Sequence, residues 1–427
     1  MPGRYFPRWV LKASGLIAPD ERLPCGQMVA LGAQHVVAMF GATVLAPLLM
    51  GFDPNVAIFM SGVGTLLFFA VTGGRVPSYL GSSFAFIGVV IAATGYAGGG
   101  ANPRLPLALS GIVACGAAYA VIGAVVMATG TRWIEKWMPP VVTGAVVAVI
   151  GLNLAPIAVK SAGASAFSAG MALATVVLVG VVAVYARGVT QRLLILVGLA
   201  LAYALHAMLT NGFGLGTPID FSGVSRAAWL GAPGFSTPRF DGSAIALIAP
   251  VAVVLVAENL GHLKAVGAMT GRDLDPWLGR AFVGDGLATI VAGSVGGTGV
   301  TTYAENIGVM AVTRIYSTLV FVVAAAIALA LGFSPKFGAV IQTIPAPVLA
   351  GVSIVVFGLI AIAGARIWVQ NRVDFGDNRN LIVAAVTLVL GAGDFTLRLG
   401  AFTLGGIGTA TFGAILLHAL MRGRSGD

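Results

Sequence analysis

Long apolar segments recur along almost the whole chain, and they constrain its fold more than any other feature. About fourteen are long enough, or nearly so, to cross a bilayer, which takes about 20 helical residues. Charged residues are only 9% of the 427 residues, against about 25% in a soluble domain. The sequence therefore predicts an all-α polytopic membrane protein. The predicted spans are approximately 28–49, 55–73, 78–96, 107–129, 139–159, 168–186, 191–210, 243–263, 279–295, 301–312, 316–332, 345–366, 380–393 and 399–420.

Positive charge predicts the orientation of these spans. An even number of spans puts both termini on one side of the membrane, and the positive-inside rule selects the cytoplasmic side. The net charge of +9 is scattered singly between apolar segments and forms no basic stripe, so it indicates topology rather than nucleic-acid binding. In this orientation every Lys and Arg faces the cytoplasm except Arg104, Lys160, Arg226, Arg239, Lys336 and Arg398.

A polar loop at 211–242 divides the chain into two halves of seven spans, at 28–210 and 243–420. A cytoplasmic segment at 1–27 precedes them, and a cytoplasmic tail at 421–427 follows. "PVVTGAVVAVIGL" in the fifth span resembles "PVLAGVSIVVFGL" in the twelfth, and "SFAFIGVV" in the third resembles "AENIGVM" in the tenth. Chance likeness between Gly-rich apolar stretches is the alternative.

An odd number of spans per repeat requires the second copy to be inserted upside down. Inverted repeats are typical of transporters whose substrate sites lie near the membrane midplane on discontinuous helices. The third and tenth spans are short or open with Gly, Ser and Thr, so we expect them to be broken. Each would then bring a helix N-terminus, with free backbone N–H groups, to the centre of the protein.

Three carboxylates, Glu258, Asp285 and Glu305, lie in apolar surroundings. A carboxylate at the centre of a span costs roughly 2.5–3.5 kcal/mol and usually has a function. His262 lies four residues after Glu258 and hence on the same helix face, although a position at the membrane surface near Lys264 would also explain it. Asp285, between two glycines, suits helix packing better than substrate contact.

His35 is a polar insertion in the first apolar segment. It either pairs with Glu305 from the tenth span or satisfies a neighbouring backbone carbonyl. The sequence contains no Walker loop, zinc-binding motif or nucleophile elbow. We therefore expect no metal, no cofactor and no ATP hydrolysis, and energy from an ion gradient or from the gradient of the substrate itself.

Four motifs resemble one known family. "QHVVAMFGATVLAPLL", "GSSFAFIG", "AENLGHL" and "TTYAENIGVMAVTRIYS" are similar to the nucleobase:cation symporters of the nucleobase/ascorbate transporter family, most of all to bacterial uracil and pyrimidine permeases. The resemblance implies two inverted repeats of seven spans, with short antiparallel strands in spans 3 and 10. It also implies a core domain from spans 1–4 and 8–11, and a gate domain from spans 5–7 and 12–14 that can form a homodimer.

The resemblance also implies roles for residues at matching positions. Glu258 and Glu305 would bind the substrate together with Ser83, Phe84, Tyr303 and Ala304. His35 would support Glu305, His262 would couple the proton, and Asn306 belongs to this supporting group. Uracil permeases have Gly where this chain has Ala304, and the added methyl group narrows the pocket, which weakens the expectation of strict uracil selectivity.

The resulting hypothesis is a proton-coupled symporter in the bacterial inner membrane, not an enzyme. It would import uracil, a related pyrimidine or also xanthine by alternating access. An anion carrier of the same inverted plan is one alternative, but two carboxylates would repel an anion. A second alternative is a passive nucleobase channel, which uptake against a gradient would exclude. A third is an intramembrane enzyme that uses Glu258, Glu305 and His35, which a chemically unchanged product would exclude.

Overall fold

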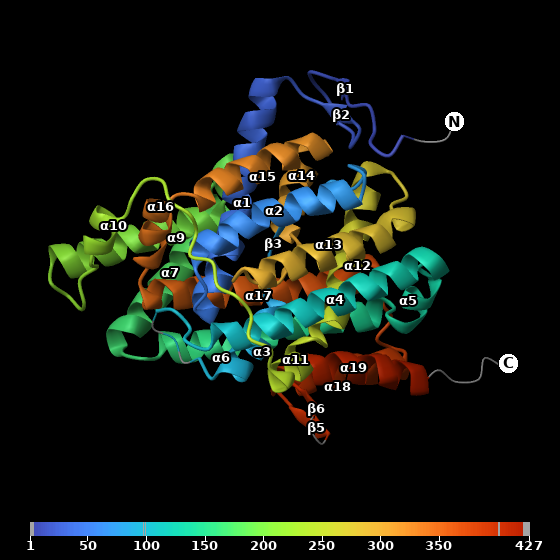
Figure 1. Cartoon of the computed structure of the whole chain (residues 1–427). Helices are drawn as coiled ribbons and strands as arrows, with labels where there is room; N and C mark the ends of the chain where they lie inside the picture. The colour runs from blue at the N-terminus through green and yellow to red at the C-terminus, as the bar shows by residue number, and fades with distance from the viewer. Residues whose placement is uncertain (1–3, 97, 99, 400–401, 422–427) are drawn as a thin grey trace.

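The computed structural model describes residues 4–421 except residues 97, 99 and 400–401 (Figure 1). The described part is mostly helical, with six short strands in three two-stranded sheets. The elements of the first half are β1 (Val10–Leu11), β2 (Glu21–Arg22), α1 (Cys25–Met50), α2 (Pro54–Val71), β3 (Leu80–Ser82), α3 (Ala85–Thr94), α4 (Leu105–Thr129), α5 (Arg132–Trp137), α6 (Pro140–Ala162), α7 (Ala166–Tyr185), α8 (Val189–Arg192), α9 (Leu194–Ala207), the π-helix η1 (Met208–Gly212) and α10 (Ser222–Arg226).

The second half repeats the order of the long elements. It contains α11 (Gly242–Ile248), α12 (Val251–Thr270), the 3-10 helix η2 (Asp275–Trp277), α13 (Leu278–Ser294), β4 (Val300–Thr302), α14 (Ala304–Thr313), α15 (Thr318–Gly332), α16 (Pro335–Gln342), α17 (Ala346–Gln370), α18 (Asn378–Ala392), β5 (Leu397–Leu399), β6 (Phe402–Leu404) and α19 (Gly406–Leu420). Of the predicted tail at 421–427, all but Met421 lies outside the described residues.

Each predicted span coincides with a helix, or with a strand followed by a helix. Eight described helical segments are long and apolar enough to cross a membrane, counting α9 with η1 and α11 with α12 as one segment each. A ninth candidate is the pair α15 and α16, which is bent by 81°. The figure of fourteen crossings stays a prediction. The start of the last span is wrong: we expected it at residue 399, but a hairpin of β5 and β6 occupies this stretch and α19 begins at Gly406.

The predicted breaks in spans 3 and 10 are confirmed. β3 and β4 pair antiparallel in the interior, with Gly81 opposite Thr301, and each strand leads directly into a ten-residue helix. Because the strands run in opposite directions, α3 and α14 begin at opposite ends of the strand pair and extend away from each other. This is the arrangement that an inverted repeat requires.

Helix packing is reciprocal between the two halves. α2 packs on α15 as α4 packs on α13, and α7 packs on α17 as α6 packs on α18. α6 and α17, which begin with the repeated segments, pack against each other, with Gly144 of α6 beside Gly364 of α17. Close approach depends on small residues: a Cβ on Gly116 of α4 would lie 2.7 Å from the carbonyl oxygen of Gly286 in α13. The division into core and gate domains is not tested and stays a prediction.

Polar caps fix where many of the helices begin. The carboxylates of Asp53, Asp241 and Asp377 accept hydrogen bonds from backbone N–H groups at the starts of α2, α11 and α18, and Ser165 and Ser334 do the same for α7 and α16. Figure 1 draws β1, β2 and the end of α19 toward one end of the molecule, with α10 and α16 toward the opposite end.

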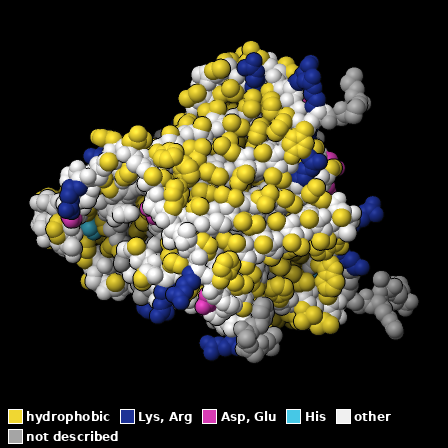
Figure 2. All heavy atoms as spheres, in the orientation of Figure 1, with side chains coloured by type: hydrophobic (Ala, Val, Ile, Leu, Met, Phe, Trp, Pro, Cys, Tyr) yellow, Lys and Arg dark blue, Asp and Glu magenta, His cyan; other side chains and the backbone are white. Residues whose placement is uncertain are grey.

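The surface is broadly apolar, as a lipid-facing protein requires. Figure 2 shows hydrophobic side chains over much of the visible face and Lys and Arg mainly around its margins. Large exposed apolar side chains recur along α7, including Leu173, Val177, Val181 and Val184. Together with the apolar helices, this surface makes the chain an integral membrane protein.

Candidate functional site

The predicted site residues meet around the strands β3 and β4. Two glycines allow the elements to approach this closely. A Cβ on Gly81 would lie 2.6 Å from the ring of Tyr303, and one on Gly299 would overlap the ring of Phe86. The half-helices α3 and α14 therefore begin within one tightly packed centre.

Ser83 joins the start of α3 to α12. Its hydroxyl accepts a hydrogen bond from the backbone N–H of Ala85 (3.3 Å) and donates to Oε2 of Glu258 (3.5 Å). Phe84 follows, and its ring meets Phe357 of α17 edge to face at 6.1 Å. The structure thus brings together Ser83, Phe84 and Glu258, with the half-buried carboxylate beside a helix N-terminus.

Glu305 lies in the first turn of α14 and is exposed, as is its neighbour Ala304. The exposed face continues along α14 through Gly308, whose added Cβ would meet no atom within 4 Å, to Val312. The equivalent helix α3 is buried over most of its length. The two half-helices therefore differ: α14 presents one uncovered face from the centre of the protein to its C-terminal end, and α3 does not.

Tyr303, which was predicted to contact substrate, has a structural role in this arrangement. The side chain is 4% exposed. Its hydroxyl donates to the carbonyl oxygen of Ser82 (2.9 Å) and accepts from the hydroxyl of Thr43 (3.0 Å). These bonds fix the aromatic ring between α1 and β3.

His35 does not form the predicted pair with Glu305. The amide of Asn306 donates instead to Nδ1 of His35 (3.0 Å) and to the backbone carbonyl oxygen of His35 (3.1 Å). The His35 ring also packs on Phe321 at 4.6 Å between centroids. His35 and Asn306 are both buried, so α1 does support α14, but through the residue after Glu305.

His262 begins a buried polar chain that the sequence did not reveal. Its Nδ1 lies 2.8 Å from Oγ1 of Thr302, and that hydroxyl donates to Oδ1 of Asn259 (3.4 Å). The Asn259 amide donates to Oδ2 of Asp285 and to the hydroxyl of Tyr119 (3.0 Å). Thr302 and Asn259 are the site residues that sequence reasoning missed, although Asn259 directly follows Glu258.

Asp285 has the role between helices that its glycine neighbours suggested. It is fully buried in α13 and connects that helix to α12 through Asn259. Its second oxygen, Oδ1, has no hydrogen-bond partner among the described residues. The carboxyl group thus ends the polar chain that starts at His262.

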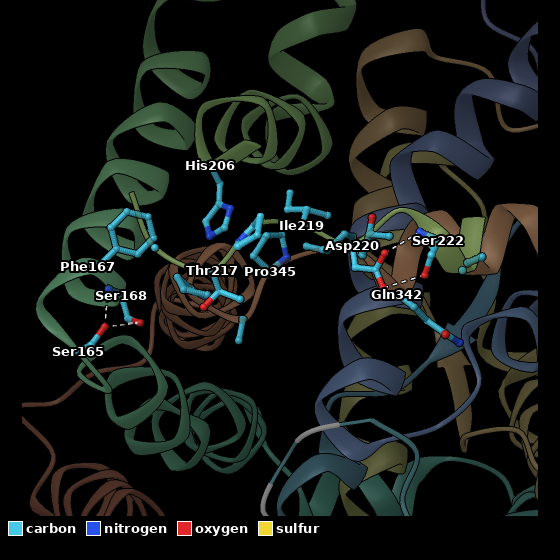
Figure 3. Close-up of a pocket in the computed structure, with 18 of the residues that line it drawn as sticks. Ser165, Phe167, Ser168, His206, Thr217, Ile219, Asp220, Ser222, Gln342 and Pro345 are labelled. Carbon is cyan, nitrogen blue, oxygen red and sulfur yellow. Dashed lines mark hydrogen bonds between the residues drawn. The ribbon is translucent and has the colours of Figure 1, made fainter. Parts of the chain in front are cut away.

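A separate cavity of about 760 Å³ lies between the start of α7, α9, the loop before α10 and the junction of α16 and α17 (Figure 3). Its polar side chains bond to each other: the hydroxyl of Ser165 donates to that of Ser168 (3.0 Å), and the hydroxyl of Ser222 donates to Asp220 (2.8 Å). Within the described part of the chain, no predicted site residue lines this cavity.

Sequence comparison identifies relatives along nearly the full chain. A profile of the protein family described as "Permease family" matches residues 26–400. The protein named "Putative pyrimidine permease RutG" from Escherichia coli (strain K12) is 71% identical over 420 residues, covering 97% of this chain and 95% of that protein. The "Uracil permease" of Paenibacillus larvae subsp. larvae is 43% identical over 418 residues, covering 94% of this chain and 96% of that protein.

Structure comparison finds the same overall fold in a more distant transporter. The murine Solute Carrier 26 family member A9 anion transporter aligns with a TM-score of 0.64 at 12% sequence identity, covering 93% of this chain and 68% of that chain. At this identity the likeness concerns the inverted-repeat fold alone.

Proposed function

We propose a substrate and a mechanism for this chain, which belongs to the nucleobase/ascorbate transporter family of permeases. The chain is a membrane transporter of this family rather than an enzyme. The finer proposal is import of uracil or a related pyrimidine, with xanthine as a further candidate, together with a proton. The named pyrimidine and uracil permeases support the substrate class.

One observation carries the proposal: Glu258 beside Ser83 at the start of α3, and Glu305 at the uncovered start of α14. A pyrimidine ring alternates N–H donors with carbonyl acceptors along its edge. Carboxylates accept from ring N–H groups, and backbone N–H groups at a helix N-terminus donate to ring carbonyl oxygens. The face of Phe84 would supply apolar contact to the ring.

The difference between α3 and α14 supports alternating access. In this structure one face of α14, including Glu305, is uncovered, while most of α3 is buried. Rocking of one helix bundle against the other would cover α14 and uncover α3, as in transporters with inverted repeats. A proton taken up by a site carboxyl group on one side would be released on the other.

The bonds between His35 and Asn306 would hold α14 in place against α1. The polar chain that starts at His262 would connect the substrate site to Asp285. The anion-carrier alternative has less support, since like charges in a poorly solvated site repel strongly. The likeness to an anion transporter is one of fold only. The proposal also includes a homodimer that forms through the gate domain. It places both termini in the cytoplasm and the protein in the bacterial inner membrane.

Calorimetric titration of the detergent-purified protein tests the substrate class. We expect saturable binding of uracil, with thymine, cytosine and xanthine as competitors that rank the preference, and no binding of sulfate or bicarbonate. Binding of either anion without binding of any nucleobase would support the anion carrier instead.

A further inference from the structure

The N-terminal segment of residues 4–22, called the strap here, lies across the ends of α2, α14 and α15. Its first anchor is Tyr5, whose hydroxyl lies 2.8 and 2.9 Å from the carbonyl oxygens of Ala70 and Val71 at the end of α2. The guanidinium of Arg280 lies 5.4 Å from the centre of the Tyr5 ring. The strap therefore has specific contacts with the helical domain from its start.

Trp9 is the second anchor and reaches α15. Its ring stacks on Phe69 of α2 at 5.8 Å, and Phe6 stacks on the same ring at 5.7 Å. The indole N–H of Trp9 donates to the hydroxyl of Thr318, the first residue of α15 (2.9 Å). The same Thr318 bonds to the carbonyl oxygen of Pro19 in the strap (3.0 Å), so two parts of the strap hold one residue.

Ile17 is the third anchor and reaches the end of α14. Its N–H donates to the carbonyl oxygen of Arg314 (3.0 Å), and its carbonyl oxygen accepts from the N–H of Tyr316 (2.8 Å). The side chain of Ile17 is fully buried. Arg314 caps α14 with a left-handed φ of 56°, so the strap pairs with the backbone where this half-helix stops.

The pairing with the strap matters because α14 is short and packed on only part of its surface. The helix has ten residues, fewer than the roughly 12–15 below which an isolated helix is marginal. One of its faces is uncovered, so packing from that side cannot hold it. The start of α14 is held by β4 and by the bonds of Asn306 to His35, and the strap fixes its other end.

We propose that Ile17 and Trp9 are positioning residues for the substrate site. By fixing the junction of α14 and α15, they set the position of the rigid half-helix and hence of the Glu305 carboxyl group. This inference rests on the proposed function of that site. It makes substrate affinity depend on a segment that lies outside the membrane spans.

The test compares Ile17→Ala and Trp9→Phe with the control Val10→Ala, a strap residue that is 64% exposed. Trp9→Phe keeps an aromatic ring on Phe69 and removes only the hydrogen bond to Thr318. Two quantities are measured on the purified full chain: hydrogen–deuterium exchange of residues 304–313 and the uracil dissociation constant.

We expect each variant to speed exchange in α14 and to raise the uracil dissociation constant. For Trp9→Phe the increase should be about fivefold, the factor for one lost hydrogen bond. Ile17→Ala keeps both backbone bonds and removes the buried side-chain packing at the end of α14. Exchange in α4 and α13 should not change, and Val10→Ala should match the wild type. Unchanged exchange in α14 in both variants would overturn the proposal, and so would an equal increase in every helix. A wild-type protein that does not bind uracil would instead count against the proposed function, and the exchange measurement would still decide the role of the strap.

Discussion

The contact between His35 and Asn306 predicts a specific energetic coupling between α1 and α14. Asn306→Ala removes two hydrogen bonds, to Nδ1 and to the backbone carbonyl oxygen of His35. Each bond contributes about 1 kcal/mol, so Asn306→Ala should lower the free energy of unfolding by about 2 kcal/mol. His35→Ala removes only the bond to Nδ1 and the packing on Phe321, because the backbone carbonyl remains.

Only the bond between the two side chains is lost in both single variants. The coupling energy in a double-mutant cycle of His35→Ala and Asn306→Ala should therefore be about 0.6–1 kcal/mol. The corresponding cycle of His35→Ala and Glu305→Gln should be additive within about 0.5 kcal/mol, since the structure places no hydrogen bond between those side chains.

Reversible unfolding in mixed detergent micelles, followed by circular dichroism, would provide the free energies for both cycles. Uracil titration of each folded variant would show whether the loss reaches the site. Coupling between His35 and Glu305 together with additivity between His35 and Asn306 would refute this account and restore the pair expected from the sequence.

Three further predictions concern the site directly. Glu258→Gln should weaken uracil binding by about 1.5–3 kcal/mol, roughly 10- to 150-fold by calorimetry, because a donor replaces an acceptor; wild-type affinity would remove Glu258 from the site. Gly81→Ala should destabilise the protein by roughly 1–3 kcal/mol, because the added Cβ would press on Tyr303 and Thr43. The control Gly308→Ala should not lower the thermal midpoint, because a Cβ at residue 308 would face open space. Uptake at fixed voltage should rise as external pH falls from about 8 to about 6 if a carboxyl group takes up the proton, and a flat pH profile would contradict proton coupling.

Hydropathy and glycine content were sufficient to predict the apolar helical segments and the broken pair. Both signals are local: an apolar stretch of a given length forms a span, and short Gly, Ser and Thr openings allow the strands β3 and β4. The hairpin of β5 and β6 was missed because Leu399, Phe402 and Leu404 are apolar and lie close before α19, so hydropathy assigned them to the same span.

Contacts between spans were harder to predict. Successive residues on a helix point about 100° apart, so choosing between Glu305 and Asn306 as the partner of His35 required the rotation of α14 about its axis. No local pattern supplies that rotation. The chain from His262 through Thr302 to Asn259 was missed for the same reason, since it joins residues on α12 and β4 that only the fold brings together.

Uptake of labelled uracil into proteoliposomes that contain only this protein tests the central claim most directly. A membrane potential of about 100 mV and a gradient of one pH unit supply about 2.3 and 1.4 kcal/mol, enough for roughly 500-fold accumulation with one proton per substrate. We predict accumulation of unchanged uracil above the external concentration, its collapse by a proton ionophore, and its absence with Glu258→Gln. Equilibration without accumulation, or accumulation driven by a sodium gradient and not by a proton gradient, would contradict the account.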